Sequence, residues 1–150
     1  MERKIVHVVG TGTIGEPLIG ILCEQKSNLG IDEVTFHKHS PLTVDKPKID
    51  NLMKKGARLS VLEDRVDDFK AIDLEPEFTL EEAIARSSVV IDCTPGGSGL
   101  VNKEQYYNKY TDRVKGFLAQ GSENGFGKKY ARGINDHVIS SNDQFLNCVM

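Results

Sequence analysis

The residues best placed to do chemistry lie near the start of the chain, in a glycine motif of the form G-x-G-x-x-G. Its six positions are Gly10, Thr11, Gly12, Thr13, Ile14 and Gly15. The motif follows an apolar, β-like run at 4–9 and opens a helix-like run at 13–26. In this setting Gly10 allows a tight turn, Gly12 lets a pyrophosphate approach the backbone, and Gly15 lets the helix pack closely. We therefore expect the motif to bind a dinucleotide, the alternative being a glycine-rich turn without a ligand.

A second candidate site follows the next apolar run, which ends at His37, Lys38 and His39. Domains that prefer NAD place an acidic residue about 20 residues beyond the glycines, where it bonds the ribose hydroxyls. Here Asp32 and Glu33 precede the run, so a cation takes the acidic position. Lys38, with His37 or His39 as a further donor, suits a 2′-phosphate, so the cofactor is NADP or NAD with NADP favoured. A solvated charged loop is the alternative; a metal site at the two histidines is disfavoured because no third ligand is nearby.

Two later loops are expected to complete the cofactor site. A buried-strand pattern at 88–93 is followed by a second glycine-rich loop, and another strand pattern ends at 120. The cofactor-binding candidates in these loops are Thr94, Pro95, Gly96, Gln120 and Gly121. Ligands of parallel sheets bind beyond the carboxyl ends of the strands, which is where these loops begin. Asp92, inside the first of these strands, is expected to bond loop amides rather than act as a catalytic acid.

The elements that must position these residues alternate between strand and helix patterns. We predict strands at 4–9, 34–36, 57–62, 88–93, 114–120 and 137–140, and helices at 13–26, 45–55, 79–86 and 102–110. The 63–70 segment is expected to be a loop with a short helix, and Thr79 with Glu82 forms a capping box at a helix start. The alternation predicts an α/β fold with a doubly wound, mostly parallel sheet, a Rossmann-type NAD(P)-binding domain.

Composition excludes several classes of protein. The chain has 150 residues, 27% of them charged, and a net charge of −3, so one domain without a basic field for nucleic acid is expected. No apolar run has the length of a membrane span, and no signal-peptide pattern precedes the first strand, which makes a cytoplasmic location the default. The three cysteines show no C-x-x-C spacing, so neither a disulfide framework nor a zinc site is expected.

Several short segments together resemble the archaeal-type glyceraldehyde-3-phosphate dehydrogenases. They are the glycine motif, the Lys38 loop ending at Pro41, and segments 55–61, 92–95, 118–121 and 138–142. The resemblance covers residues 4–142 and implies an oxidoreductase of the cytoplasm, active in glycolysis or gluconeogenesis. Such an enzyme oxidises an aldehyde phosphate through a covalent thiohemiacetal, passes hydride to NAD(P) and releases the acyl group to phosphate. A homo-oligomer is compatible with this resemblance.

Two departures from the family bear on activity. The family's nucleophile is the cysteine of a Ser-Cys-Asn run, whereas this chain has Ser141 followed by Asn142 at the catalytic position. A serine hydroxyl needs an adjacent base, and none is evident. The family also continues into a catalytic domain, so we expect residues 1–150 to be a single dinucleotide-binding domain that lacks it and is inactive alone. A non-catalytic nucleotide-binding module, or the cofactor domain of another semialdehyde dehydrogenase or a reductase, are the alternatives.

Overall fold

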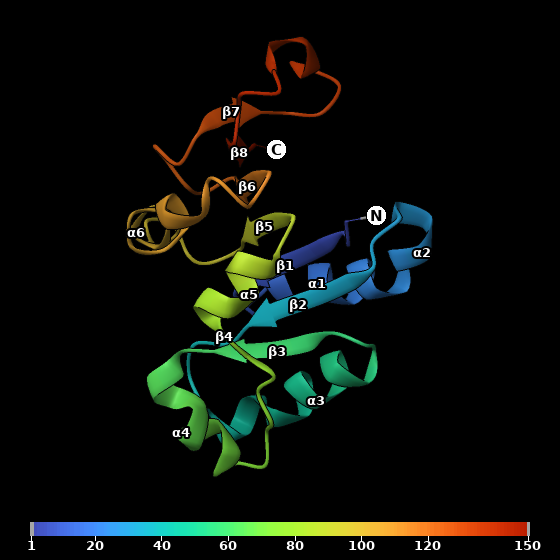
Figure 1. The fold of residues 1–150 in the computed structure, drawn as a ribbon, viewed down its shortest axis with the longest axis vertical. Helices are drawn as coiled ribbons and strands as arrows, with labels where there is room; N and C mark the ends of the chain where they lie inside the picture. The colour runs from blue at the N-terminus through green and yellow to red at the C-terminus, as the bar shows by residue number, and fades with distance from the viewer. Residues whose placement is uncertain (1, 150) are drawn as a thin grey trace.

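Eight strands form one sheet in the part of the chain that the computed structural model describes, residues 2–149 (Figure 1). Their order across the sheet is β4-β3-β2-β1-β5-β6-β8-β7, and every neighbouring pair is parallel. The strands are β1 (Ile5–Val9), β2 (Glu33–His37), β3 (Arg58–Val61), β4 (Phe78–Thr79), β5 (Val89–Asp92), β6 (Gly116–Ala119), β7 (Lys128–Tyr130) and β8 (Phe145–Cys148). The predicted α/β fold of Rossmann type is confirmed, and the sheet is parallel throughout.

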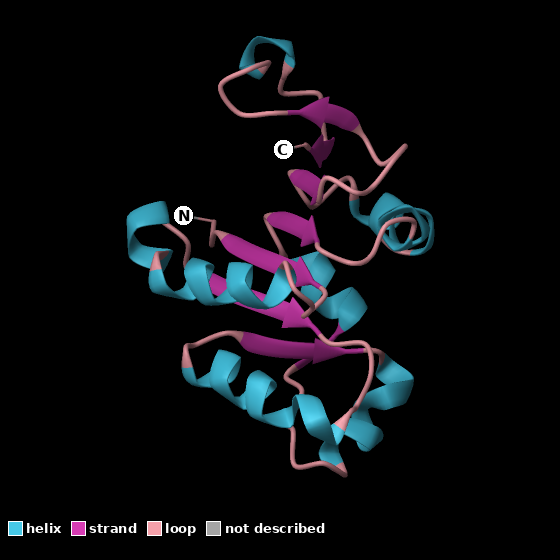
Figure 2. Ribbon diagram, turned by 180° about the vertical axis from the view of Figure 1, so that it is seen from behind, coloured by secondary structure: helices cyan, strands magenta, loops and turns pink. Residues whose placement is uncertain are grey.

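Helices cover both faces of this sheet. They are α1 (Gly15–Glu24), α2 (Lys26–Leu29), α3 (Lys46–Lys54), α4 (Val66–Lys70), α5 (Leu80–Arg86) and α6 (Ser98–Gln105), with short 3-10 turns η1 (Thr43–Asp45), η2 (Glu63–Arg65), η3 (Tyr107–Tyr110) and η4 (Asp136–Val138). Figure 2 shows α1 and α3 in front of the strands, on the face opposite to α5. The core is divided accordingly: one apolar cluster joins α1, α3 and α4 to the sheet, and the other joins α5 and η3 to it.

Local signals in the sequence account for three of the helix boundaries. The Thr79 hydroxyl accepts from the Glu82 amide while the Glu82 carboxylate accepts from the Thr79 amide, so the predicted capping box opens α5. Gly30 ends α2 with a φ of +65°, and Gly56 follows α3 with a φ of +101°. Glycine adopts this left-handed backbone without the steric cost that a Cβ atom adds.

Two helix predictions need correction. Helix α1 is shorter than 13–26, and Ile14 and Ile21 are about half exposed, although their spacing fits an apolar face. Ile19 makes the buried contacts together with Leu22, because the close approach of the helix to the sheet selects the face that carries Gly15. Helix α6 begins at Ser98, four residues before the predicted start, and ends before the 3-10 turn η3.

The prediction of a last strand at 137–140 is wrong. Residues Asp136–Val138 form η4, Val138 is exposed, and the strand beside β6 is β8. Phe145 in β8 stacks on Phe117 in β6 with ring centroids 4.7 Å apart, and this packing decides which short apolar run joins the sheet. Strands β4 and β7 were not predicted; each is only two or three residues long.

Candidate functional site

The glycine motif forms a tight loop between β1 and α1, at the carboxyl edge of the sheet. Gly10 has a φ of +104°, and a Cβ atom there would lie 3.1 Å from the carbonyl oxygen of Cys93. A Cβ atom on Gly15 would lie 1.9 Å from the carbonyl oxygen of Gly10, which no real contact allows. Gly12, in contrast, faces open space, with no atom within 4 Å of a Cβ built there. The loop therefore needs glycine for its own shape at positions 10 and 15, whereas Gly12 faces space that a ligand could occupy.

The amides at the start of α1 are free to bind an anion. Within residues 2–149, the amides of Gly12, Thr13 and Ile14 donate to no other protein group, and no side chain caps the helix. The Gly10 amide instead donates to the carbonyl of His37 at 3.3 Å, which ties the loop to the end of β2. Free amides and the positive end of the helix dipole together make an N-terminus of this kind an anion-binding site.

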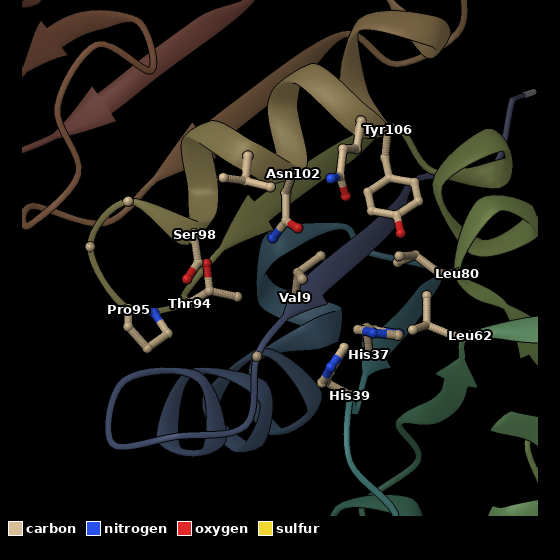
Figure 3. Close-up of a pocket in the computed structure, with 15 residues that line it drawn as sticks. Val9, His37, His39, Leu62, Leu80, Thr94, Pro95, Ser98, Asn102 and Tyr106 are labelled. Carbon is tan, nitrogen blue, oxygen red and sulfur yellow. The ribbon is translucent and has the colours of Figure 1, made fainter.

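Two cavities flank the glycine loop. The first measures about 580 Å³, and its lining contains nine of the predicted cofactor-binding residues: Gly10, Thr11, Gly12, Thr13, Ile14, Lys38, Thr94, Pro95 and Gln120. The second measures about 540 Å³ and is more apolar; Figure 3 shows Leu62, Leu80 and Tyr106 around it. Its lining includes His37 and Gly96, and it shares Thr94 and Pro95 with the first cavity. Gly15 is buried against Gly10 and, like Gly121, lines neither cavity.

The cation at the end of β2 has an acidic neighbour that the sequence reading missed. The Lys38 ammonium lies 2.8 Å from a carboxylate oxygen of Asp45, and the Lys48 ammonium lies 3.5 Å from the other oxygen. The hydrogen bond from Lys38 holds the pKa of the Asp45 carboxyl below its ordinary value. Lys48 also donates to the carbonyl of Thr11 at 3.0 Å, which braces the glycine loop. The one signal for this group was the i, i+3 spacing of Asp45 and Lys48 at a predicted helix start.

His37 is a buried, neutral side chain rather than a further cation. Burial, followed by the charge of His39, lowers the pKa of His37 from 6.5 to about 4. Its Nδ1 atom has no hydrogen-bond partner in the described part of the chain, and its ring faces the second cavity (Figure 3). At neutral pH it therefore offers a hydrogen bond, not a charge, to a ligand.

Asp92 and Glu123 organise the second glycine-rich loop. As predicted, the Asp92 carboxylate bonds a loop amide, that of Thr94 at 3.0 Å, and it also accepts from the Tyr107 hydroxyl at 2.5 Å. Burial, followed by the charge of Asp92, raises the pKa of Tyr107 well above its ordinary value, so this hydroxyl keeps its proton. Glu123, in the loop after β6, accepts from the amides of Gly97 and Gly99. No local pattern in the sequence signals that pairing.

The structure separates Ser141 and Asn142 from the glycine loop. Both residues are exposed in a turn that precedes β8 rather than following a last strand. Two residues later, the Gln144 carbonyl accepts from the amide of Phe117 near the start of β6, so the turn lies at the amino edge of the sheet. Neither residue lines either cavity.

Two kinds of feature are absent from residues 2–149. No helix in that range combines the length and apolar character that a membrane crossing requires. No three histidine, cysteine, aspartate or glutamate side chains there converge as a metal-ligand set.

Comparison with known proteins confirms the resemblance that the short segments indicate. The chain is 35% identical over 120 residues to a glyceraldehyde-3-phosphate dehydrogenase of Pyrobaculum arsenaticum, an alignment that covers 79% of this chain and 31% of the relative. It is 32% identical over 130 residues to the enzyme of the same name from Methanopyrus kandleri, covering 82% and 34%. The chain thus spans about a third of the length of these curated relatives. No protein-family model matches it.

Proposed function

We propose that the chain binds a nicotinamide dinucleotide, NADP or NAD, at the carboxyl edge of its sheet. The observation that carries this proposal is the set of three free amides at the start of α1, at Gly12, Thr13 and Ile14. They lie beside β1, between β2 on one side and β5 on the other, where the order of the strands reverses. In open parallel sheets this switch point is where dinucleotides bind.

The two cavities suit the two halves of such a ligand. We assign the adenosine to the second cavity, where Leu62, Leu80 and Tyr106 offer an apolar surface for a flat ring. The pyrophosphate would accept from the free amides, and the nicotinamide half would extend along the first cavity toward Gln120. The adenosine ribose would lie where the two cavities meet, at Gly10 and His39, which line both. Lys38, next to His39, is the residue proposed to favour the 2′-phosphate that NADP carries on this ribose.

By analogy with its relatives, we place the domain with the cytoplasmic enzymes that oxidise glyceraldehyde 3-phosphate in glycolysis or gluconeogenesis. Its part there would be to hold the cofactor. We expect no aldehyde oxidation from the 150-residue chain by itself. A non-catalytic nucleotide-binding module is the second candidate, and the exposed position of Ser141 at the opposite edge of the sheet favours it.

The test is calorimetric titration of NADP and NAD into the parent chain and Gly12→Val. Saturable binding is expected for the parent, and an affinity at least about tenfold lower for the variant, since a side chain at Gly12 enters the space assigned to the pyrophosphate. The unfolding temperature should not change, because that side of Gly12 is open. Gly116→Ala is the matched control: its Cβ atom would approach nothing closer than 3.9 Å, in a strand outside both cavities. If neither dinucleotide binds at millimolar concentration, the proposal fails.

A further inference from the structure

Glu123 is a buried carboxylate without a cation beside it. Its side chain is 3% exposed, and none of the ion pairs among residues 2–149 includes it. Its partners are backbone amides: both carboxylate oxygens lie 3.0 Å from the amide nitrogen of Gly97, and one lies 3.0 Å from that of Gly99. A polar group this deeply buried is tolerated only where its hydrogen bonds are satisfied, so the two amides and the Glu123 side chain depend on each other.

These amides belong to the first turn of α6. Gly97 is the residue before the helix, and no side chain of the helix itself caps it. The Glu123 carboxylate therefore occupies the place at the start of α6 that an anionic ligand would take. The two glycine-rich loops thus differ in kind: the amides at the start of α1 are open, while those at the start of α6 are already used.

A further contact connects the loop after β6 to residues that line both cavities. The Gln120 side chain donates to the carbonyl of Thr94 at 3.0 Å, at the other end of the second glycine-rich loop. Thr94 and Pro95 line both cavities, so the position of this loop sets the distance between the two glycine-rich loops. Gly99 leaves room for the arrangement, since a Cβ atom there would lie 2.8 Å from a Glu123 oxygen.

We propose that Glu123 is a positioning residue for the dinucleotide. It holds the second glycine-rich loop at the distance from the first loop that the ligand requires. Because it occupies the amides of Gly97 and Gly99, these amides do not bind the ligand's phosphates. This inference rests on the proposed function. Loss of the carboxylate leaves the amides of Gly97 and Gly99 without partners, frees the loop to move, and weakens binding although no ligand contact is removed.

The test compares Glu123→Gln with the parent in two measurements. Calorimetry of the folded protein gives the affinity for NADP, and amide hydrogen exchange reports Gly97 and Gly99 directly. The glutamine keeps the shape but replaces one acceptor oxygen by a donor, so faster exchange at both amides and an affinity lower by about tenfold or more are expected. Glu104→Gln, an exposed change in the last turn of α6, is the control and should leave both unchanged.

Gly99→Ala supplies a second, independent variant that decides the question if Glu123→Gln does not fold. Its Cβ atom pushes against the Glu123 carboxylate, so the same loss of affinity is expected with Glu123 still present. A parental affinity in folded Glu123→Gln, or in folded Gly99→Ala, would overturn the inference and reduce Glu123 to a structural role. A parent chain that binds no dinucleotide would instead overturn the proposed function, and the exchange rates would still tell whether Glu123 holds the loop.

Discussion

At the scale of single residues, the choice of cofactor depends on a pair of opposite charges. Lys38 alone would favour a 2′-phosphate, but its ammonium is already 2.8 Å from the Asp45 carboxylate. A 2′-phosphate would therefore have to share Lys38 with Asp45, and its own charge would be repelled by that carboxylate. We expect the preference for NADP to be incomplete for this reason.

Two substitutions with opposite effects test this competition. Lys38→Glu should weaken NADP roughly tenfold to a hundredfold more than NAD, because one charge-assisted hydrogen bond is lost. Asp45→Asn should strengthen NADP relative to NAD, since it frees Lys38 and removes a repelling charge. Paired titrations at low and high salt measure both effects, and added salt should shrink them.

Lys46→Glu is the control for net charge. Like Lys38→Glu, it replaces a positive by a negative charge. Lys46 lies in α3, lines neither cavity, and contacts Asp50 and the carbonyl of Asp73. An equal loss of both cofactors in Lys38→Glu would show that Lys38 is structural or solvated.

At the scale of elements, the Glu33 carboxylate connects the amino ends of β1, β2 and β3 to the carboxyl end of α5. Glu33 opens β2 and is 4% exposed; Arg86 at the end of α5 contacts it at 2.7 Å, and Arg58 at the start of β3 and Arg3 before β1 each at 3.0 Å. Burial by itself raises the pKa of Glu33, but the hydrogen bond and charge of Arg86, with the charges of Arg58 and Arg3, outweigh it and lower the pKa. The guanidinium groups of Arg58 and Arg86 also lie 4.6 Å and 4.2 Å from the ring centroid of Phe78 in β4.

Glu33→Gln should therefore lower the free energy of unfolding by about 3 kcal/mol, toward the low end for a broken buried pair because the arginines are partly exposed. The matched control is Glu77→Gln, which removes an exposed partner of Arg58 and should cost at most about 1 kcal/mol. Urea unfolding at neutral pH measures both. Equal losses for the two variants would mean that Glu33 acts as an ordinary surface ion pair.

At the scale of the whole molecule, two buried histidines make folding depend on pH. His7 in β1 is fully buried, its Nδ1 atom lies 2.7 Å from the Thr35 hydroxyl, and its Nε2 atom has no partner in the described chain. Burial, with the charge of His37 second, lowers the pKa of His7 from 6.5 to about 3. His37 in β2, with a pKa of about 4, lies on the same face of the sheet. Both are neutral in the folded protein.

The sign of the pH effect follows from these values. Above pH 6.5 both histidines are neutral in the folded and in the unfolded chain. Below pH 6.5 the unfolded chain protonates them and the folded chain does not, so the free energy of unfolding decreases as the pH is lowered. The decrease continues to about pH 4 for His37 and to about pH 3 for His7. The expected loss between pH 7 and 5 is roughly 2 kcal/mol for each histidine. Chemical denaturation across this range should show the slope about halved in His37→Leu and unchanged in the control, the exposed His137→Asn. A parental slope in His37→Leu would exclude His37 as the source.

Features that depend on neighbours within one or two turns of chain, or on the order of strand and helix patterns, could be predicted from the sequence. The alternation of strand and helix patterns predicted the parallel sheet, the Thr79 capping box predicted the start of α5, and the spacing of three glycines predicted the loop before α1. The capping box and the glycine loop are decided by local backbone geometry: which residues adopt a left-handed φ, lack a Cβ atom, or cap a free amide. Nine predicted cofactor-binding residues line one cavity, because the parallel sheet brings the ends of its strands to one edge.

Features that depend on contacts between distant segments could be known only from the folded chain. The Glu123 carboxylate reaches an amide 26 positions earlier, which the order of β5 and β6 in the sheet makes possible and no local pattern signals. The choice of β8 over the run at 137–140 depended on a partner for Phe145 across the sheet, and it moved Ser141 to the opposite edge from the glycine loop. Short apolar runs have similar local preferences, so burial against a particular neighbour settles which of them becomes a strand.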